Sequence, residues 1–262
     1  MKKNILSATV ILLIAVISVG YKKFQMHQNP VVAHRGAFKA KSLPENSVAA
    51  LKNAISLNCA GAEFDIWMTA DDSLVICHDP EFNHLNIETS TYKTLLNSGT
   101  LPNGESLPLL HQYLEEGLKD NNKTQLVLEI KPSKISNERS VEIAGRVMKA
   151  VKDLNAKANV AYISFNYDVV KYISSVDDNA VTQYLNGDKT PRELKEAGIK
   201  GLDYHYNVYK KNPEWIKEAK ESGLILNVWT VNKVSDLQFF LDQEFDFITT
   251  NEPELLLTLL SK

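Results

Sequence analysis

The chain has 262 residues, of which 44% are hydrophobic and 23% charged, an ordinary globular composition with enough length for one large domain. A formal net charge of −3 supplies no basic excess to neutralise phosphates, which argues against a general nucleic-acid binder. The two cysteines, Cys59 and Cys77, are too few for a disulfide framework, and the sequence leaves open whether they pair or stay free.

The N-terminus differs in composition from the rest of the chain. Two lysines at positions 2–3 precede sixteen uncharged residues, 5–20. A cationic start before an apolar run is typical of an export signal or an uncleaved membrane anchor, whereas a buried first helix of the fold is disfavoured because the run is apolar on every face. We expect residues 1–26 to be a signal peptide or anchor and residues 27–262 to be the folded domain. The protein is then exported, periplasmic or extracellular, with residues 5–20 able to tether it to a membrane.

From residue 29 onward, short apolar runs alternate with amphipathic segments. Such alternation predicts a parallel sheet in the α/β class, and eight strand–helix units would close a TIM (β/α)8 barrel. The expected strands are 31–36, 62–69, 73–79, 125–131, 159–165, 180–185, 201–206, 224–231 and 245–250. The expected helices are 45–57, 140–154, 167–175, 191–197, 213–222 and 234–241.

Nine strands are one more than the barrel needs, and the connection at residues 70–73 explains the surplus. This link can form a hairpin but is too short to cross over between parallel strands, so the third strand is a hairpin excursion. With Asp71 and Asp72 as a two-residue turn, Asp65 lies opposite His78, and Glu63 shares their face. A three-residue turn would shift this register.

Polar residues stand where several of these strands end. In an α/β barrel the C-terminal strand ends carry the chemistry, so we expect these side chains to converge although they are far apart in sequence. They are His34, Arg35, Glu63, Asp65, His78, Glu129 and Lys131, with Trp229 ending a later strand.

Three of these groups are carboxylates, Glu63, Asp65 and Glu129, which would repel one another without a cation. Carboxylate oxygens without thiolates favour one hard divalent ion, Mg²⁺, Ca²⁺ or Mn²⁺. The alternatives are a solvated hairpin edge for the first two residues and, for Glu129 and Lys131, an ordinary surface ion pair.

The histidines and cations suit phosphodiester chemistry. Hydrolysis needs one group to deprotonate the nucleophile and another to protonate the leaving alkoxide, and His34 with His78 would supply both. Taken singly, a histidine such as His34 or His78 is more often structural than catalytic, so the catalytic role depends on two of them standing at neighbouring strand ends. Arg35 offers a forked donor for phosphate oxygens, Lys131 a point charge, and Gly36 lets the backbone approach an anion closely.

Six short motifs in this order resemble the glycerophosphodiester phosphodiesterase family over residues 31 to about 253. They are HRG (34–36), PEN (44–46), EFD (63–65), HD (78–79), EIK (129–131) and WTVN (229–232). The resemblance implies a TIM-barrel metallo-phosphodiesterase that hydrolyses glycerophosphodiesters to glycerol 3-phosphate and an alcohol. By the same resemblance, His34 and His78 would be the acid–base pair, and Glu63, Asp65 and Glu129 would bind the metal. Arg35 and Lys131 would hold the phosphate, and Trp229 would line the pocket against the glycerol. Glu45 would support this site without an assigned contact.

The chain departs from the family pattern in two places. Asn251 stands where the family usually has an aspartate, and residues 81–91 replace its usual Arg-Thr-Thr element. The latter lie in the insertion region, 80–124, which in the family caps the site and shapes the preference for the leaving alcohol. We therefore expect the core chemistry to be kept and the choice of alcohol to be open.

Two other functions remain open from the sequence. A lysophospholipase D-type enzyme would need an apolar groove for an acyl chain, for which Phe82, Leu85 and Ile87 are the candidates. A non-catalytic barrel that binds phosphodiesters would be marked by loss of a histidine or a metal carboxylate, and the motifs retain all of them.

Overall fold

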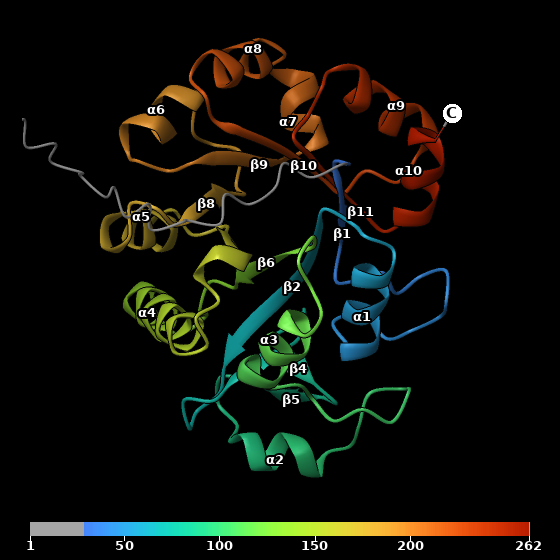
Figure 1. The fold of residues 1–262 in the computed structure, drawn as a ribbon. Coiled ribbons are helices and arrows are strands. Elements are labelled where there is room, and N and C mark those ends of the chain that lie inside the picture. The colour runs from blue at the N-terminus through green and yellow to red at the C-terminus, as the bar shows by residue number, and fades with distance from the viewer. Residues whose placement is uncertain (1–28, 262) are drawn as a thin grey trace, which may run out of the picture.

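The computed structural model describes residues 29–261, which form a closed parallel barrel surrounded by helices (Figure 1). All strands of its nine-stranded sheet except β3 belong to the barrel, and β1 pairs with both β2 and β11, which closes the ring. The predicted TIM barrel is therefore confirmed. The barrel strands are β1 (Val31–Ala33), β2 (Gly61–Met68), β6 (Gln125–Ile130), β7 (Val160–Ser164), β8 (Val181–Tyr184), β9 (Gly201–His205), β10 (Ile225–Trp229) and β11 (Phe247–Thr250).

Alternation along each strand divides the apolar side chains into two cores. Outward residues such as Phe64 pack under the helices, where its ring lies 4.7 Å from that of Tyr113. Inward residues such as Val32 and Val127 fill the barrel interior. Gly61 makes this interior layer possible, because a Cβ at that position would lie 3.0 Å from Val127 and 3.1 Å from Val32.

The surrounding helices include all those expected from the sequence, although some boundaries move. The expected helix at 45–57 begins only at residue 48, because Ser47 caps it and leaves residues 44–46 as a loop over the barrel mouth. The six expected helices are α1 (Val48–Ser56), α4 (Asn137–Asp153), α5 (Tyr167–Val176), α6 (Pro191–Glu196), α8 (Glu214–Glu221) and α9 (Val234–Asp242). Four further helices were not expected: α2 (Tyr92–Asn97), α3 (Leu110–Leu118), α7 (Tyr206–Lys211) and α10 (Pro253–Leu260).

The hairpin between β2 and β3 (Leu74–Ile76) is confirmed, but its predicted register is wrong by one residue. Thr69 N donates to Ser73 O over 2.9 Å, so the loop contains three residues instead of two. Asp72 adopts the left-handed conformation, φ 63°, that commonly ends such a loop. As a result Cys77, whose N–H donates to Asp65 O over 3.0 Å, lies opposite Asp65 in place of His78.

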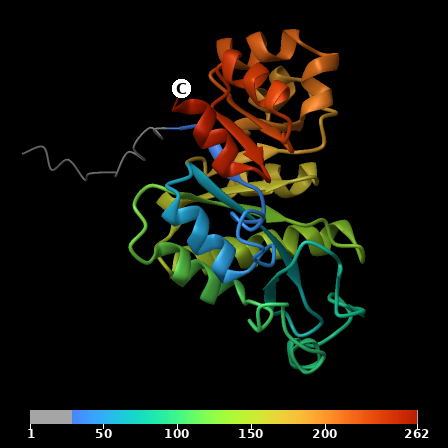
Figure 2. The same ribbon diagram turned by 90° about the vertical axis from the view of Figure 1, so that its right-hand side faces the viewer.

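The insertion after β3 carries a small core of its own and projects from one side of the barrel, coloured teal to green in Figure 2. It contains β4 (Glu81–Phe82), β5 (Leu85–Asn86) and the helices α2 and α3. Phe82 and Ile87 are buried in this core together with Trp67, and Leu85 packs against it. These three candidates for an acyl-chain groove are therefore used in holding the insertion together.

Residues 1–26, including the apolar run 5–20, lie outside the described residues, so the expected signal peptide or anchor stays a prediction. Within residues 29–261, no helix has both the length and the apolar character needed to cross a membrane. Cys59 and Cys77 are both free thiols, the first buried and the second half-buried.

Candidate active site

The three predicted metal ligands meet inside the barrel. Glu63 and Asp65 share the inward face of β2, and Glu129 lies on the neighbouring strand β6, where it is the register partner of Asp65. One oxygen from each carboxylate lies within 4.8 Å of the others, and all three side chains are buried. The structure thus brings together residues that are 66 positions apart in the chain.

The electrostatics of this triad suit a divalent cation. Burial, together with repulsion from Asp65 and Glu129, raises the pKa of Glu63 well above its ordinary value. Burial and the charge of Asp65 likewise raise the pKa of Glu129 to about 8. Glu63 Oε1 is buried and has no hydrogen-bond partner in the described chain. A hard divalent ion would relieve the repulsion and occupy that free oxygen, so the residues present fit the metal that the sequence implies.

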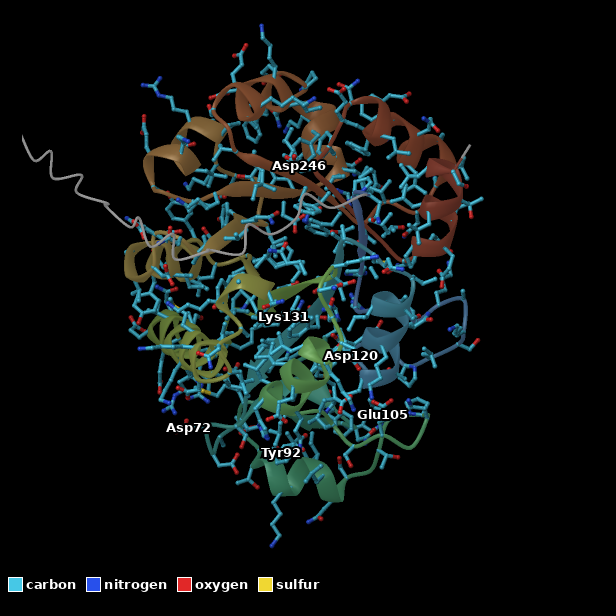
Figure 3. All side chains as sticks on the ribbon, viewed as in Figure 1. Asp72, Tyr92, Glu105, Asp120, Lys131 and Asp246 are labelled. Atoms are coloured by element: carbon cyan, nitrogen blue, oxygen red, sulfur yellow. The ribbon has the colours of Figure 1, made fainter. Side chains whose placement is uncertain are left out.

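Lys131 also takes part in this cluster, near the centre of the barrel (Figure 3). Its Nζ lies 2.7 Å from Asp65 Oδ1 and 2.7 Å from Glu129 Oε1. Burial alone would raise the pKa of Asp65, but the neighbouring Lys131 ammonium outweighs it and holds that pKa below its ordinary value. Lys131 therefore already neutralises part of the acidic cluster, and its expected contact with a substrate phosphate stays a prediction.

Asn46 fixes Asp65 from the loop that precedes α1. Its Nδ2 donates to Asp65 Oδ2 over 2.7 Å, and Asp65 N donates back to Asn46 Oδ1 over 3.1 Å. Asn46 adopts φ 58°, a left-handed conformation that asparagine tolerates better than most residues. Asn46 belongs to the PEN motif at residues 44–46, which is the signal that the sequence offers for this residue, although the sequence alone assigns it no role.

The tight turn after β1 explains why HRG follows an apolar strand. Arg35 has φ 54°, and its N–H donates to Glu63 Oε2 over 2.7 Å, so the backbone of the turn orients a triad carboxylate. Gly36 has φ 77°, and a Cβ there would lie 2.7 Å from the backbone of Ala50, which only glycine avoids. The Arg35 guanidinium is held by Glu45, with Nη1 at 2.9 and 2.8 Å from its two oxygens.

The two histidines share one pattern of hydrogen bonds. His34 Nδ1 lies 2.7 Å from Asn251 Oδ1, and His78 Nδ1 lies 2.7 Å from Asp79 Oδ1. Since an amide oxygen only accepts, His34 carries its proton on Nδ1 and leaves Nε2 as the free base, 4.0 Å from Glu63. Burial and the nearby Arg35 charge lower the pKa of His34 to about 4, which keeps its imidazole neutral at pH 7.

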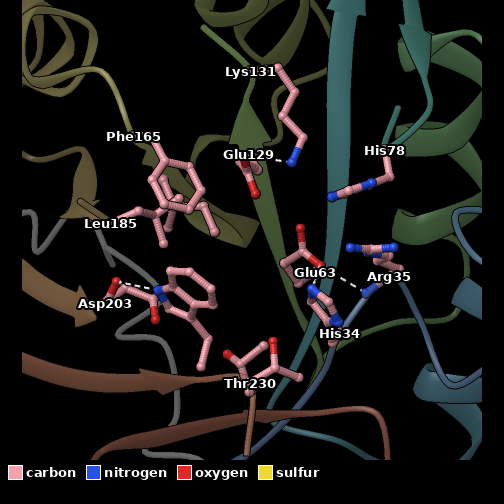
Figure 4. A pocket seen from close by; sticks show the side chains of 13 residues that line it. His34, Arg35, Glu63, His78, Glu129, Lys131, Phe165, Leu185, Asp203 and Thr230 are labelled. Carbon is pink, nitrogen blue, oxygen red and sulfur yellow. Dashed lines mark hydrogen bonds and ion pairs between the residues drawn. The ribbon is translucent and has the colours of Figure 1, made fainter. Parts of the chain in front are cut away.

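Both histidines open onto one pocket, whose opposite wall is apolar (Figure 4). Phe165 and Leu185 lie across the pocket from Arg35 and His78, with Glu63 and Glu129 between them. The Trp229 ring meets Phe165 edge to face at 5.4 Å, and its Nε1 donates to the Asp203 carbonyl over 2.9 Å. The cavity volume is about 110 Å³, enough for a small organic group.

The eight predicted site residues thus gather at one cavity, which has a polar wall and an apolar wall. All but Asp65 line the cavity itself, and Asp65 lies directly behind it in the acidic cluster. The polar wall offers cations, carboxylates and two imidazoles, which suit a phosphodiester and a metal ion. The apolar wall suits the carbon atoms of a small alcohol or polyol.

A model of the glycerophosphoryl diester phosphodiesterase family matches residues 34–255. A crystal structure of a glycerophosphodiester phosphodiesterase from Parabacteroides distasonis is 37% identical, with a TM-score of 0.85, covering 90% of this chain and 98% of that one. A glycerophosphodiester phosphodiesterase of Caldanaerobacter subterraneus is 27% identical over 88% of this chain and 98% of its own length. An Oleispira antarctica phosphodiesterase, solved with its product sn-glycerol-3-phosphate, shares the fold at 18% identity and a TM-score of 0.72, covering 88% of this chain and 96% of that one.

Proposed function

Because the chain belongs to the glycerophosphoryl diester phosphodiesterase family, a family of phosphoric diester hydrolases, we propose that it hydrolyses glycerophosphodiesters to glycerol 3-phosphate and an alcohol. The observation that carries this proposal is the complete site. Three buried carboxylates stand beside two histidines whose Nδ1 atoms are both held by acceptors. The product that we expect is the one bound to the Oleispira antarctica phosphodiesterase.

The substrate phosphate binds between the acidic triad and the histidines. Arg35 contributes a guanidinium whose Nε has no hydrogen-bond partner within residues 29–261, and Lys131 contributes its ammonium from the end of β6. The glycerol carbons pack against Trp229, with the leaving alcohol on the side of His78. A divalent ion held by Glu63, Asp65 and Glu129 would supply positive charge for the glycerol hydroxyls and for the charge that develops in the transition state.

Proton transfer is divided between the histidines. His34 Nε2 takes the proton of the attacking oxygen, which is either water or a glycerol hydroxyl, because Asn251 keeps the other ring nitrogen protonated. The attacking oxygen bonds to phosphorus as the bond from phosphorus to the leaving oxygen breaks. Attack by water gives glycerol 3-phosphate directly, whereas attack by a glycerol hydroxyl gives a cyclic phosphate that a water molecule must then open to glycerol 3-phosphate. His78, whose Nδ1 is held by Asp79, donates the Nε2 proton to that oxygen, which leaves as an alcohol.

The two alternative functions have less support. A lysophospholipase D-type site needs an apolar groove, and the residues expected to build it are packed in the core of the insertion. A non-catalytic barrel gives no reason to keep two histidines and three carboxylates around one small cavity, where burying the carboxylates costs free energy of folding.

The proposal is tested by incubating the purified protein with glycerophosphocholine and, in parallel, with lysophosphatidylcholine. Release of glycerol 3-phosphate is followed with a coupled dehydrogenase, first in EDTA and then with Mg²⁺, Ca²⁺ or Mn²⁺ added back. We expect release from glycerophosphocholine that EDTA abolishes and a divalent ion restores. Choline release from the lysophospholipid alone would favour the lysophospholipase D reading, and no release from either substrate would contradict both.

We further propose that the apolar N-terminal segment exports the protein and either is cleaved or anchors it. The support is the cationic start before the uncharged run at 5–20. Fractionation of cells that express the full chain tests this proposal. Recovery with the cytoplasmic proteins would contradict it.

A further inference from the structure

The insertion, residues 80–124, follows His78 in the chain, yet none of its residues lines the cavity. Its apolar side chains form a separate core with Trp67 beside the barrel. One polar side chain of the insertion, Glu105, nevertheless reaches a segment that supports the acidic triad. Glu105 lies in the loop between α2 and α3 (Figure 3).

Glu105 caps the N-terminus of α1, although it stands 57 positions further along the chain than the first residue of that helix. Its Oε2 accepts from Val48 N over 2.8 Å, and its Oε1 accepts from Ala49 N over 3.1 Å. Ser47 Oγ accepts from Ala50 N over 3.0 Å. The first three N–H groups of α1, which have no partner inside a helix, are therefore satisfied. The first turn of α1 has no acidic residue of its own, so Glu105 supplies the negative charge that a helix N-terminus favours.

The loop around Glu105 fixes the position of its carboxylate. Asn103 Nδ2 donates to Glu105 Oε1 over 2.8 Å, and Glu105 N donates back to Asn103 Oδ1 over 3.2 Å. Leu101 N donates to Glu105 O over 2.8 Å across a turn in which Gly104 has φ 86°. Leu101 in turn packs against the core of the insertion. Glu105 is thus held by the insertion on one side and by α1 on the other.

The segment that Glu105 holds is the one that carries Asn46. Asn46 lies two residues before Val48, and its side chain exchanges two hydrogen bonds with Asp65 of the acidic triad. Asn46 N also donates to Arg35 O over 3.0 Å, so the same loop contacts the turn after β1. Asn46 has φ 58°, and a residue in this conformation keeps it where the surrounding structure holds the chain on both sides. One short loop therefore connects the insertion to a metal-site carboxylate.

We propose that Glu105 is a positioning residue, which holds the start of α1 and, through Asn46, fixes the Asp65 carboxylate for metal binding. This inference rests on the proposed function, which includes a divalent ion at the triad. The insertion then supports the acidic cluster from behind. A second contact between the insertion and α1 provides the matched control, because Glu116 pairs with Lys52 at 2.6 Å, one helical turn further from Asn46.

The amide of Asp65 reports the contact with Asn46 directly, because Asp65 N donates to Asn46 Oδ1. Its hydrogen exchange is measured by NMR on the metal-free protein in EDTA. We expect Glu105→Ala to accelerate this exchange about tenfold, the scale of losing a hydrogen bond, while the amides of β9 across the barrel keep their rates. Glu105→Gln, which keeps one acceptor oxygen, should give a smaller acceleration, and Glu116→Ala none.

Calorimetric titration with Mn²⁺ tests the link to the metal. Glu105→Ala should weaken binding roughly tenfold. Asn46→Gly, in which glycine keeps the left-handed backbone, should weaken it about 10- to 100-fold, as for residues that hold a metal ligand. Because Glu105 acts through Asn46, the double variant should bind Mn²⁺ as weakly as Asn46→Gly alone and no more weakly. Glu116→Ala should bind Mn²⁺ as the wild type does.

Three results would overturn this role of Glu105: unchanged exchange at Asp65 in Glu105→Ala, an equal acceleration in β9, or additive losses of Mn²⁺ affinity in the double variant. The second result marks a contribution to overall stability alone. In each case hydrolysis of glycerophosphocholine by the wild type leaves the proposed function standing. If the wild type neither binds Mn²⁺ nor hydrolyses glycerophosphocholine, the proposed function fails, and the exchange rates in EDTA still decide whether Glu105 holds Asp65. If Glu105→Ala does not fold, Glu105→Gln carries the same comparisons.

Discussion

The two halves of the barrel mouth are built on different principles although the same fold supports both. The half formed by β1, β2 and β6 carries ionisable side chains joined by short hydrogen bonds, such as the pair between Asn46 and Asp65. The half formed by β7, β8 and β10 carries Phe165, Leu185 and Trp229, which are held mainly by packing. Chemistry needs atoms at fixed positions, whereas recognition of a small alcohol needs a surface of the right shape.

Burial explains why the polar half is so heavily cross-linked. A buried charge without a partner costs several kcal/mol, so each charged group there needs a neighbour to position and balance it. Glu45 holds Arg35, and Lys131 stands between Asp65 and Glu129. The apolar half has no such requirement, so a substitution there should change binding more than the rate of the chemical step.

The largest effect is expected from His34→Ala in the polar half. Loss of the base should lower kcat by about 10²- to 10⁴-fold, because general base catalysis typically contributes that much. Folding should be nearly intact, since within residues 29–261 the polar partners of the ring are Asn251 and, at 4.0 Å, the Glu63 carboxylate. Steady-state kinetics and a melting curve check this, with the exposed His111→Ala as control. A near-normal kcat would remove His34 from the mechanism.

Glu63→Gln should weaken metal binding at least about tenfold, because a neutral amide is a poorer ligand for a hard divalent ion. The shape of the turn should be kept, since the amide oxygen can still accept from Arg35 N. Calorimetric titration with Mn²⁺ measures the change, and Glu142→Gln on the exposed face of α4 is the matched control. An unchanged titration would show that the triad does not hold the ion.

The apolar half should respond differently. Trp229→Ala should raise KM for glycerophosphocholine roughly tenfold, which is the scale of losing one buried aromatic contact, and change kcat much less. Trp229→Phe should recover most of the affinity, although it loses the hydrogen bond to the Asp203 carbonyl. If Trp229→Ala lowered kcat as strongly as His34→Ala, the proposed division between chemistry and recognition would be wrong.

The smallest effect concerns the stability of the metal-free protein. The folded-state pKa of Glu129 is raised to about 8, so the folded state holds a proton that the unfolded state releases near pH 4.5. Its contribution to stability is therefore fully present below pH 4.5 and is lost as the pH rises towards 8. Between pH 5 and 8 in EDTA, the melting temperature of the wild type should fall more than that of Glu129→Gln. Equal slopes would contradict the raised pKa.

Much of the fold was predictable because it depends on repeating patterns. All nine expected strands form, since apolar runs between amphipathic segments are a strong signal of a parallel barrel. The register of the hairpin was not predictable, because it depends on the single left-handed residue Asp72. The helices α2 and α7 were missed because six residues give little periodicity. The equally short α6 was expected, and it begins at Pro191, a residue favoured in the first turn of a helix.

The site was predictable where several residues act together and not where one residue acts alone. Strand alternation places Glu63, Asp65 and Glu129 on one inward surface, and the structure confirms that they meet. The sequence predicted no role for Asn46, and it marked Asn251 only as a departure from the family pattern. A lone amide in a loop carries no pattern, and only the folded chain shows Asn251 against His34.

The division of the barrel mouth into a polar and an apolar half is tested most directly by a crystal structure of the protein with Mn²⁺ and sn-glycerol 3-phosphate. Anomalous scattering locates the ion. We expect an anomalous peak among Glu63, Asp65 and Glu129. We also expect the phosphate beside Arg35 and the glycerol carbons against Trp229. An anomalous peak away from the triad, or glycerol directed towards the insertion, would contradict the division of the mouth into a chemical and a recognition half.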